Sequence, residues 1–295
     1  MLAATDAKLQ TQSGQTLALH DWPCANARAQ VLLVHGLGEH AGRYAGLAQQ
    51  LNAWGYAVLA YDQQGHGLST GARGGITHDD ALLDDLADVL AHPRTRSAAH
   101  LPLVLLGHSL GGLTAARFVS LHPQAVDALV LSSPALDPGL NALQKILLAT
   151  LPHLLPDLRV NNGLDAKALS HDAAVMAAYR ADPLVHARIS ARLARFIATA
   201  GPATVAAAAQ WTVPTLLLYA GADRLVNPAG SRAFAAAAGA SSLRASATVS
   251  AQEFPGLFHE LFNEAADLPE TAQVWETLQR WLNQISPIKP LTGDA

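Results

Sequence analysis

The sequence contains little cysteine, little charge and no long hydrophobic run. Cys24 is the one cysteine among 295 residues, so the chain can form neither an internal disulfide nor a cysteine-cluster metal site. Only 14% of the residues are charged, and the formal net charge of −4 lacks the basic excess that nucleic-acid binding usually requires. No stretch reaches the roughly 18 consecutive apolar residues of a membrane span, and the N-terminus does not resemble a signal peptide. We therefore expect a soluble, cytoplasmic protein that binds no nucleic acid.

Short apolar runs separated by turn residues predict seven strands. They are Thr16–His20, Val31–His35, Tyr56–Tyr61, Leu103–Gly107, Ala128–Ser132, Thr215–Ala220 and about Ser246–Glu253. Residues 31–34 and 103–106 are continuously apolar, which is typical of strands buried on both faces of a parallel sheet. No crossover helix precedes Val31, so we expect the first strand to pair antiparallel at the edge of the sheet.

Helical patterns lie between these strands. They are Tyr44–Trp54, Asp79–Ala91, Leu110–Leu121, Ser231–Ala238 and Glu270–Ile285. Strands that alternate with helices predict an α/β protein with a mostly parallel, doubly wound sheet.

Residues 137–211 interrupt this alternation, because they show helical periodicity and no convincing strand. We interpret them as an inserted helical cap between two parts of one core, residues 1–136 and 212–285, with a tail at 286–295. One apolar stripe in the cap consists of Leu140, Leu143, Leu147, Leu151 and Leu154. It either packs on the core or forms a lid that lines an acyl tunnel or touches a lipid surface. Arg188, Arg192 and Arg195 have helical spacing and predict a solvated helix face.

The segment Gly107-His108-Ser109-Leu110-Gly111 matches the pattern G-x-S-x-G between a predicted strand and a predicted helix. A nucleophile elbow requires this setting, in which a sharp turn exposes the serine and flanking glycines avoid collisions. Ser109 is therefore the candidate nucleophile.

A serine nucleophile needs a general base, and the base needs an acid that orients it. With a nucleophile elbow the chain order is serine, acid, histidine, and His259 is the one histidine beyond the last predicted strands. Asp223, just after the strand Thr215–Ala220, is the favoured acid; Asp137 is the alternative. His259-Glu260 also begins the zinc-protease pattern H-E-x-x-H, but Asn263 stands at its last position and excludes that site.

The backbone N–H groups of Leu37 and Leu110 are the candidate oxyanion-hole donors. Leu110 follows the nucleophile, and Leu37 lies in the loop after the strand at Val31, where this arrangement places the second donor. His35 begins that loop, and we expect it to brace the loop rather than to react.

Several further segments resemble one family. His35-Gly-Leu-Gly-Glu-His-Ala-Gly-Arg-Tyr44 resembles the opening H-G-x-G-E-H-x-G-R-Y of the monoacylglycerol lipase and lysophospholipase-like serine hydrolases. Gly65-His-Gly-Leu-Ser69, Ser132-Ser-Pro-Ala-Leu136 and Gly221-Ala-Asp-Arg-Leu-Val226 continue the resemblance in order. It implies the α/β-hydrolase fold, Ser109, Asp223 and His259 as catalytic triad, and Leu37 and Leu110 as oxyanion donors. It also implies that the chain hydrolyses monoacylglycerols to fatty acid and glycerol through an acyl-enzyme, with no cofactor and no metal.

Gln64 departs from the family pattern, which usually has arginine there, so the bracing of its loop is in question. Glu39, His40 and Arg43 are interpreted as a structural polar network. A lysophospholipase, a short-chain carboxylesterase, a thioesterase or a carbon–carbon bond hydrolase would share the triad, and a non-catalytic ligand-binding relative is the alternative from another class. The sequence decides neither the oligomeric state nor whether the cap transiently contacts a membrane surface.

Overall fold

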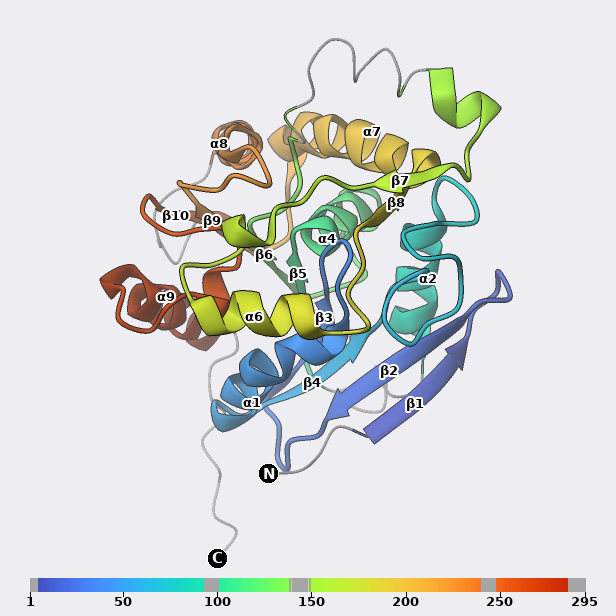
Figure 1. Ribbon diagram of the computed structural model, residues 1–295. Coiled ribbons are helices and arrows are strands. Elements are labelled where there is room, and N and C mark those ends of the chain that lie inside the picture. Colours follow the sequence, from blue (N-terminus) through green and yellow to red (C-terminus); the bar gives the residue numbers. More distant parts are fainter. Residues whose placement is uncertain are drawn as a thin grey trace, which may run out of the picture.

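The computed structural model describes residues 5–92, 101–137, 139, 148, 150–239 and 248–285. In this part of the chain an eight-stranded sheet has the order β1-β2-β4-β3-β5-β6-β9-β10 (Figure 1). The strands are β1 (Thr5–Gln10), β2 (Thr16–Trp22), β3 (Ala29–Val34), β4 (Tyr56–Tyr61), β5 (Leu103–His108), β6 (Ala128–Ser132), β9 (Thr215–Ala220) and β10 (Val249–Phe254). All seven predicted strands are present, and three of them have the predicted bounds.

The six strands from β4 across to β10 are parallel, whereas β1 and β2 pair antiparallel. The prediction that Thr16–His20 forms the sheet edge was wrong, because β1 covers it. The sequence of β1, TDAKLQ, contains no apolar run from which a strand could be predicted. The α/β class with a mostly parallel sheet is confirmed.

Helices cover both faces of the sheet. α1 (Ala45–Ala53) and α9 (Pro269–Ile285) pack on one face; α2 (Ala81–Ala91), α4 (Leu110–Leu121) and α8 (Pro228–Ala237) pack on the other. Alternate residues of one strand enter different cores, since Leu105 belongs to the cluster around α4 and Leu106 to the cluster around α1. This explains why the central strands are apolar throughout.

The segment between β6 and β9, residues 137–211, is called here the inserted segment. It contains α6 (Ala173–Ala181), α7 (Ala191–Ala207) and a two-stranded antiparallel ribbon of β7 (Arg159–Asn161) and β8 (Arg188–Ser190). The prediction that this segment has no strand was therefore wrong. Both strands have three residues, and β7 is exposed along its length, so neither shows an apolar run.

The prediction that three arginines share one solvated helix face was also wrong. Arg188 lies in β8, whereas Arg192 and Arg195 lie in α7. Arg192 donates to the carbonyl oxygen of Ile76 at 3.0 Å, and Arg195 forms an ion pair with Asp79. These two side chains attach α7 to the loop before α2.

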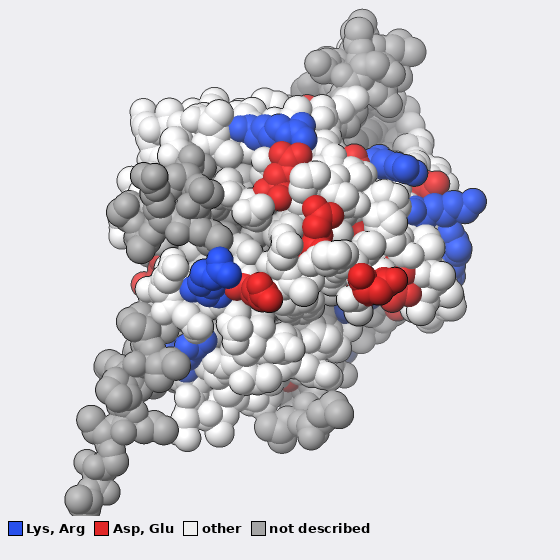
Figure 2. Space-filling model, turned by 90° about the vertical axis from the view of Figure 1, so that its left-hand side faces the viewer, with Lys and Arg blue, Asp and Glu red and all other residues white. Residues whose placement is uncertain are grey.

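Most of the predicted leucine stripe of the inserted segment lies outside the described residues. Leu151 is partly buried, and the side chain of Leu154 is 78% exposed. None of the described helices is both long and apolar enough to cross a membrane. Figure 2 shows a face of the molecule on which uncharged residues dominate and basic side chains lie beside acidic ones.

Candidate active site

Ser109 lies at the sharp turn between β5 and α4. Its backbone has φ 53° and ψ −118°, in a region that residues other than glycine rarely adopt. Hydrogen bonds hold this conformation: the N–H donates to the carbonyl oxygen of Ser132 at 3.0 Å, and the carbonyl oxygen accepts from Leu113 and Ala135 at 2.9 and 3.0 Å. The serine is thus fixed at the end of the sheet by bonds to β6 and α4.

The glycines of the motif are required by packing. A Cβ atom on Gly107 would collide with the carbonyl oxygen of Gly111, and one on Gly111 would collide with that of Val34. The turn therefore passes so close to its neighbours that only glycine fits on either side of Ser109.

His259 and Asp223 form a buried pair. The distance between His259 Nδ1 and Asp223 Oδ2 is 2.6 Å, and the side chains are 4% and 3% exposed. Asp223 Oδ1 also accepts from the backbone N–H groups of Leu225 and Val226 at 2.8 and 3.0 Å. The carboxylate is therefore held between a loop backbone and the imidazole ring.

The pKa values of Asp223 and His259 are shifted in opposite directions. Burial raises the pKa of Asp223, but the His259 charge and hydrogen bond outweigh it and leave that pKa below its ordinary value. Burial likewise lowers the pKa of His259, and Asp223 more than compensates, so this pKa lies above its ordinary value. Asp223 is thus ionised at neutral pH and keeps a proton on Nδ1 of His259.

Asp137, the alternative acid, has other partners. Its Oδ1 accepts from the N–H of Gly139 at 2.9 Å and its Oδ2 from the side chain of Asn227 at 2.7 Å. The structure therefore brings Asp223, and not Asp137, to His259.

His108 lies beside the pair. Its ring centroid is 4.7 Å from that of His259, and its Nδ1 is 3.1 Å from Ser132 Oγ. Burial and the neighbouring His259 lower the pKa of His108 to about 3. His108 is therefore neutral at neutral pH and adds no positive charge beside His259.

The loop that carries Leu37 is braced by His35 and Gln63. The Gln63 N–H donates to His35 Nε2 at 2.9 Å, and the Gln63 side chain donates to the carbonyl oxygen of His35 at 2.7 Å. In the described part of the chain, no protein acceptor takes a hydrogen bond from the N–H of Leu37 or of Leu110. Both residues line the same cavity as Ser109, so both N–H groups are available to a ligand.

Gln64 is fully buried in the next turn of this region. Its Oε1 accepts from the N–H of Thr77 at 2.7 Å, and its Nε2 has no partner among the described residues. The loop is thus braced by an amide at the position where the resemblance implies a charge.

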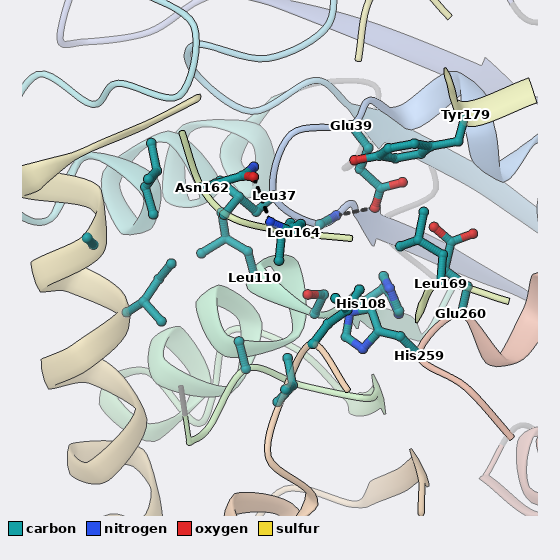
Figure 3. Close-up of a pocket in the computed structure, with 18 of the residues that line it drawn as sticks. Leu37, Glu39, His108, Leu110, Asn162, Leu164, Leu169, Tyr179, His259 and Glu260 are labelled. Carbon is teal, nitrogen blue, oxygen red and sulfur yellow. Dashed lines mark hydrogen bonds between the residues drawn. The ribbon is translucent and has the colours of Figure 1, made fainter. Parts of the chain in front are cut away.

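Ser109, His259, Leu37 and Leu110 open into one cavity of about 300 Å³ (Figure 3). The inserted segment supplies most of its apolar wall. These residues are Leu148, Leu164, Leu169, Ile189, Ala194 and Ile197. The cavity therefore has Ser109 and His259 on the sheet side and most of its apolar surface on the inserted segment.

A charged network forms another part of the cavity wall, beside Leu169, whose carbonyl oxygen accepts from the N–H of Glu260 at 2.8 Å. Arg43 pairs with Glu39 and, through two nitrogens, with Glu260 at 2.7 and 2.8 Å. Its guanidinium lies 4.8 Å from the ring centre of Tyr179 in α6. Figure 3 shows Glu39, Tyr179 and Glu260 on one side of the cavity, and Leu37, Asn162 and Leu164 on the other.

The buried charges of this wall stabilise each other. Burial alone would raise the pKa of Glu39, but Arg43 and hydrogen bonds such as that from Tyr44 lower it to about 2. Glu39 Oε1 also accepts from the N–H of Gly36 at 2.6 Å, which ties the network to the loop of Leu37. The predicted structural network thus exists, but Glu39 and Arg43 also face the cavity, whereas His40 pairs with Asp182 of the inserted segment at 2.9 Å.

Sequence reasoning missed Tyr179 and Glu260 as lining residues. Glu260 follows His259 directly, and its adjacency was the one available signal. Tyr179 comes from a helix 80 residues before the histidine, and nothing in its local sequence separates it from a surface residue.

Three comparisons with known proteins each find similarity over most of this chain. A family model described as serine aminopeptidase S33 matches residues 25–266. The monoacylglycerol lipase of Mycolicibacterium smegmatis is 35% identical over 268 residues, covering 88% of this chain and 90% of the relative. Phospholipase YtpA of Bacillus subtilis is 30% identical over 267 residues, covering 89% and 98%. The crystal structure of Paleococcus ferrophilus monoacylglycerol lipase superposes with a TM-score of 0.77 and 32% identity, covering 97% of this chain and all of that one.

Proposed function

Because the chain belongs to the S33 family of serine hydrolases, with the α/β-hydrolase fold, we propose that it hydrolyses monoacylglycerols to fatty acid and glycerol. The observation that carries the proposal is one cavity in which Ser109 and the His259–Asp223 pair meet both an apolar and a charged wall. A monoacylglycerol has one long apolar chain and one small polar head at either side of its ester bond, and this cavity matches that division.

In the proposed mechanism Ser109 is the nucleophile and His259 the general base. Asp223 holds the proton on Nδ1 of His259, so Nε2 is free to take the proton of the Ser109 hydroxyl as its oxygen attacks the ester carbonyl. The tetrahedral oxyanion lies between the N–H groups of Leu37 and Leu110. His259 then protonates the leaving glycerol, and a water molecule, deprotonated by the same histidine, hydrolyses the acyl-enzyme.

The apolar and the charged parts of the cavity wall suggest where the two ends of the substrate bind. The acyl chain lies along the leucine and isoleucine side chains of the inserted segment, where its burial is favourable by about 0.8 kcal/mol per methylene. The glycerol head lies towards Glu39, Arg43 and Glu260, whose charged groups accept and donate hydrogen bonds. We accordingly propose that residues 137–211 act as a cap on a core formed by residues 1–136 and 212–285.

A lysophospholipase is the second candidate. It is favoured by the 30% identity to a relative named phospholipase and by Arg43, a cation in the cavity wall. Against it, Glu39 and Glu260 neutralise Arg43 within the described network and present a net negative charge to a phosphate group. A short-chain carboxylesterase is the third candidate, since 300 Å³ is near the lower end of ligand-site volumes.

The test is fatty-acid release from a long-chain 1-monoacylglycerol, compared with triacylglycerol, lysophosphatidylcholine and a short-chain nitrophenyl ester. Ser109→Ala protein is the control for each substrate. We expect rapid monoacylglycerol turnover that Ser109→Ala abolishes. Preferential turnover of lysophosphatidylcholine or of the short ester would replace the proposed substrate and leave the triad in place.

We further propose that the substrate is met in the cytoplasm and at a lipid surface. The free cysteine Cys24 suits a reducing compartment. The exposed leucines at one edge of the inserted segment support contact with lipid.

A further inference from the structure

The inserted segment touches the core close to Leu37, whose N–H is one of the two proposed oxyanion donors. In Figure 1 the connection from α6 to β8 passes beside the loop that follows β3. The N–H of His186 in this connection donates to the carbonyl oxygen of Gly38 at 2.8 Å. We refer to residues 36–40 as the oxyanion loop and to residues 182–186 as the contact turn. The two segments are therefore joined directly, one residue from Leu37.

Gly38 permits this close approach. Its φ is +77°, in the left-handed region, and a Cβ at this position would lie 2.5 Å from the carbonyl oxygen of His186. Only glycine combines the backbone freedom with the missing side chain that the contact needs. The residue at position 38 thus lets the contact turn pack on the backbone of the oxyanion loop.

A side-chain pair forms a second link between the two segments. His40 Nε2 lies 2.9 Å from Asp182 Oδ2, and the two side chains are 10 and 25% exposed. The Nδ1 atom of His40 accepts from the N–H of Gly42 at 3.2 Å, so in the neutral ring the proton is on Nε2 and is donated to Asp182. This link therefore does not require a charged histidine.

The contact turn is itself held in shape. Asp182 Oδ1 accepts from the N–H of Leu184 at 2.8 Å, so one carboxylate oxygen fixes the turn while the other is left for the side-chain pair. The ring of His186 lies 4.8 Å from that of His66 in the core, and its Nε2 is 3.2 Å from the carbonyl oxygen of Gly65. Because the turn is fixed internally and against the core, it can in turn hold the loop that it contacts.

The core fixes the first residue of the oxyanion loop. The N–H of Gly36 donates to Glu39 Oε1 at 2.6 Å, and the Tyr44 hydroxyl donates to the same oxygen at 2.6 Å. The Leu37 peptide thus lies between a bond on the core side at Gly36 and a bond to the contact turn at Gly38. Oxyanion donors stabilise a transition state because they are oriented before the reaction begins. The direction of the Leu37 N–H therefore depends on both regions of the molecule.

We propose that Asp182 is a positioning residue, which through His40 holds the oxyanion loop so that the Leu37 N–H points at the oxyanion. Neither Asp182 nor His40 is among the described residues that line the cavity, so an effect of either on catalysis passes through the loop. The inserted segment thus serves the chemical step as well as the acyl chain. The inference rests on the oxyanion hole of the proposed mechanism and is independent of which ester is the natural substrate.

The experiment measures kcat and KM for a short, water-soluble nitrophenyl ester. Asp182→Ser keeps a hydroxyl that accepts from the N–H of Leu184 but is too short to reach His40. Loss of a whole oxyanion donor costs about 10²–10³ in kcat, and in this variant the His186 bond still holds the loop. We therefore expect kcat to fall about tenfold, with KM changed by less than about twofold.

A transition-state analogue separates positioning from a structural role. A trifluoromethyl ketone adds to Ser109 and places an oxyanion where the ester does, so its inhibition constant rises by the same factor as kcat/KM falls. The pH midpoint of kcat/KM stays unchanged, because Asp182→Ser leaves the pair of His259 and Asp223 intact. A merely structural role of Asp182 would lower the midpoint of urea unfolding and leave the inhibition constant unchanged.

Two further variants are controls. Asp182→Glu keeps the carboxylate, which reaches His40 with one more methylene, and recovers most of kcat. Asp172→Ser, at the other end of α6, changes a side chain that accepts from the N–H of Ala174 at 2.7 Å and has no hydrogen bond to the oxyanion loop among the described residues. It leaves kcat unchanged, because serine caps a helix about as well as aspartate does.

The same link is also broken from the side of the core. His40→Asn still accepts from the N–H of Gly42, since asparagine is a favoured N-cap, but does not reach Asp182. We expect the same fall in kcat, which keeps the proposal testable where Asp182→Ser does not fold. Because both changes break one link, the double variant has the kcat of the single ones.

Four outcomes overturn the proposal. They are an unchanged kcat in Asp182→Ser, an equal fall in Asp172→Ser, a rise of KM alone, which would place Asp182 in substrate binding, and effects that multiply in the double variant. An unchanged kcat in Asp182→Ser, with monoacylglycerol turnover by the wild type, counts against this inference alone. A fall in kcat on the short ester, without any monoacylglycerol turnover by the wild type, counts against the proposed substrate alone. A wild type that hydrolyses neither ester contradicts both.

Discussion

The sheet and the inserted segment divide the molecule into two regions with opposite character. The strands β3, β5 and β6 are buried along almost their whole length, whereas β7 is fully exposed and α6 has no buried residue. Ser109, Asp223 and His259 all follow strands of the sheet; six apolar residues of the cavity come from the inserted segment. The sheet thus positions Ser109, Asp223 and His259, whereas the inserted segment, whose α7 has buried residues and whose α6 has none, supplies most of the apolar cavity wall.

The largest expected effect lies in the sheet region. Asp223→Asn leaves His259 without the charge that holds its tautomer, and kcat falls by about 10⁴-fold. Ser109→Ala removes the proposed nucleophile and has the larger effect of the two, a fall in kcat of about 10⁶-fold. Steady-state hydrolysis of a monoacylglycerol measures both.

Asp137→Asn is the matched control for the acid. Asp137 bonds to Gly139 and Asn227, so its variant retains activity to within about tenfold. If Asp137→Asn and Asp223→Asn lost activity equally, the pair seen in the structure would not be the functional one.

A smaller and selective effect is expected in the inserted segment. Ala194→Phe on α7 fills part of the apolar wall, and kcat/KM for a long acyl chain falls about 10- to 100-fold relative to a short one. Thr199→Phe, on the exposed side of the same helix, is the control and leaves the ratio unchanged. A uniform loss on all chain lengths would show that α7 also positions the triad, which would break the division between the two regions.

The pH dependence of kcat/KM tests whether His259, at the end of the sheet, is the general base. Since Asp223 raises the pKa of His259, its neutral imidazole predominates only at pH values above that raised pKa. We expect kcat/KM to fall tenfold per pH unit on the acid side, with a midpoint above the ordinary histidine value of about 6.5. His171→Gln, where the inserted segment contacts Glu264, leaves the midpoint unchanged; a midpoint at or below 6.5 would contradict the assignment.

The smallest expected effect concerns stability alone. Asp85 on α2 is buried, its Oδ2 has no partner among the described residues, and burial together with Asp88 raises its pKa to about 7. Between about pH 4 and 7 the unfolded chain releases this proton and the folded chain keeps it, so the free energy of unfolding falls as pH rises and then levels off. Asp85→Asn removes that loss and stabilises the protein above pH 7 by on the order of 2 kcal/mol.

Urea unfolding at pH 5 and pH 8 measures this difference. Asp84→Asn, an exposed neighbour on the same helix, is the control and changes stability little. Equal stability of wild type and Asp85→Asn at pH 8 would show that the buried carboxylate of Asp85 does not destabilise the folded protein. Catalytic activity is unaffected in either case, because Asp85 does not line the cavity.

The sequence by itself determined seven of the eight strands of the described sheet and the turn at Ser109, and it predicted the chain order of the proposed triad. Residues 103–106 are apolar because they are buried on two faces, and the glycines around Ser109 are needed because a Cβ would collide with backbone. Both are local requirements that leave a local pattern. The position of His259 after the last strand followed from topology alone.

Tertiary structure alone decided the features that depend on distant partners. Arg43 joins Glu39 to Glu260, and Tyr179 enters the cavity from a helix far along the chain. The sequence favoured Asp223 over Asp137, but only the fold brings Asp223 to His259. The ribbon of β7 and β8 was missed for the same reason, since three-residue strands are stabilised by each other and by the loop at Gly74, whose carbonyl oxygen accepts from Ser190 at 2.8 Å. Hydrogen bonds and ion pairs between segments leave no periodic signal in either segment, and so only the folded chain reveals them.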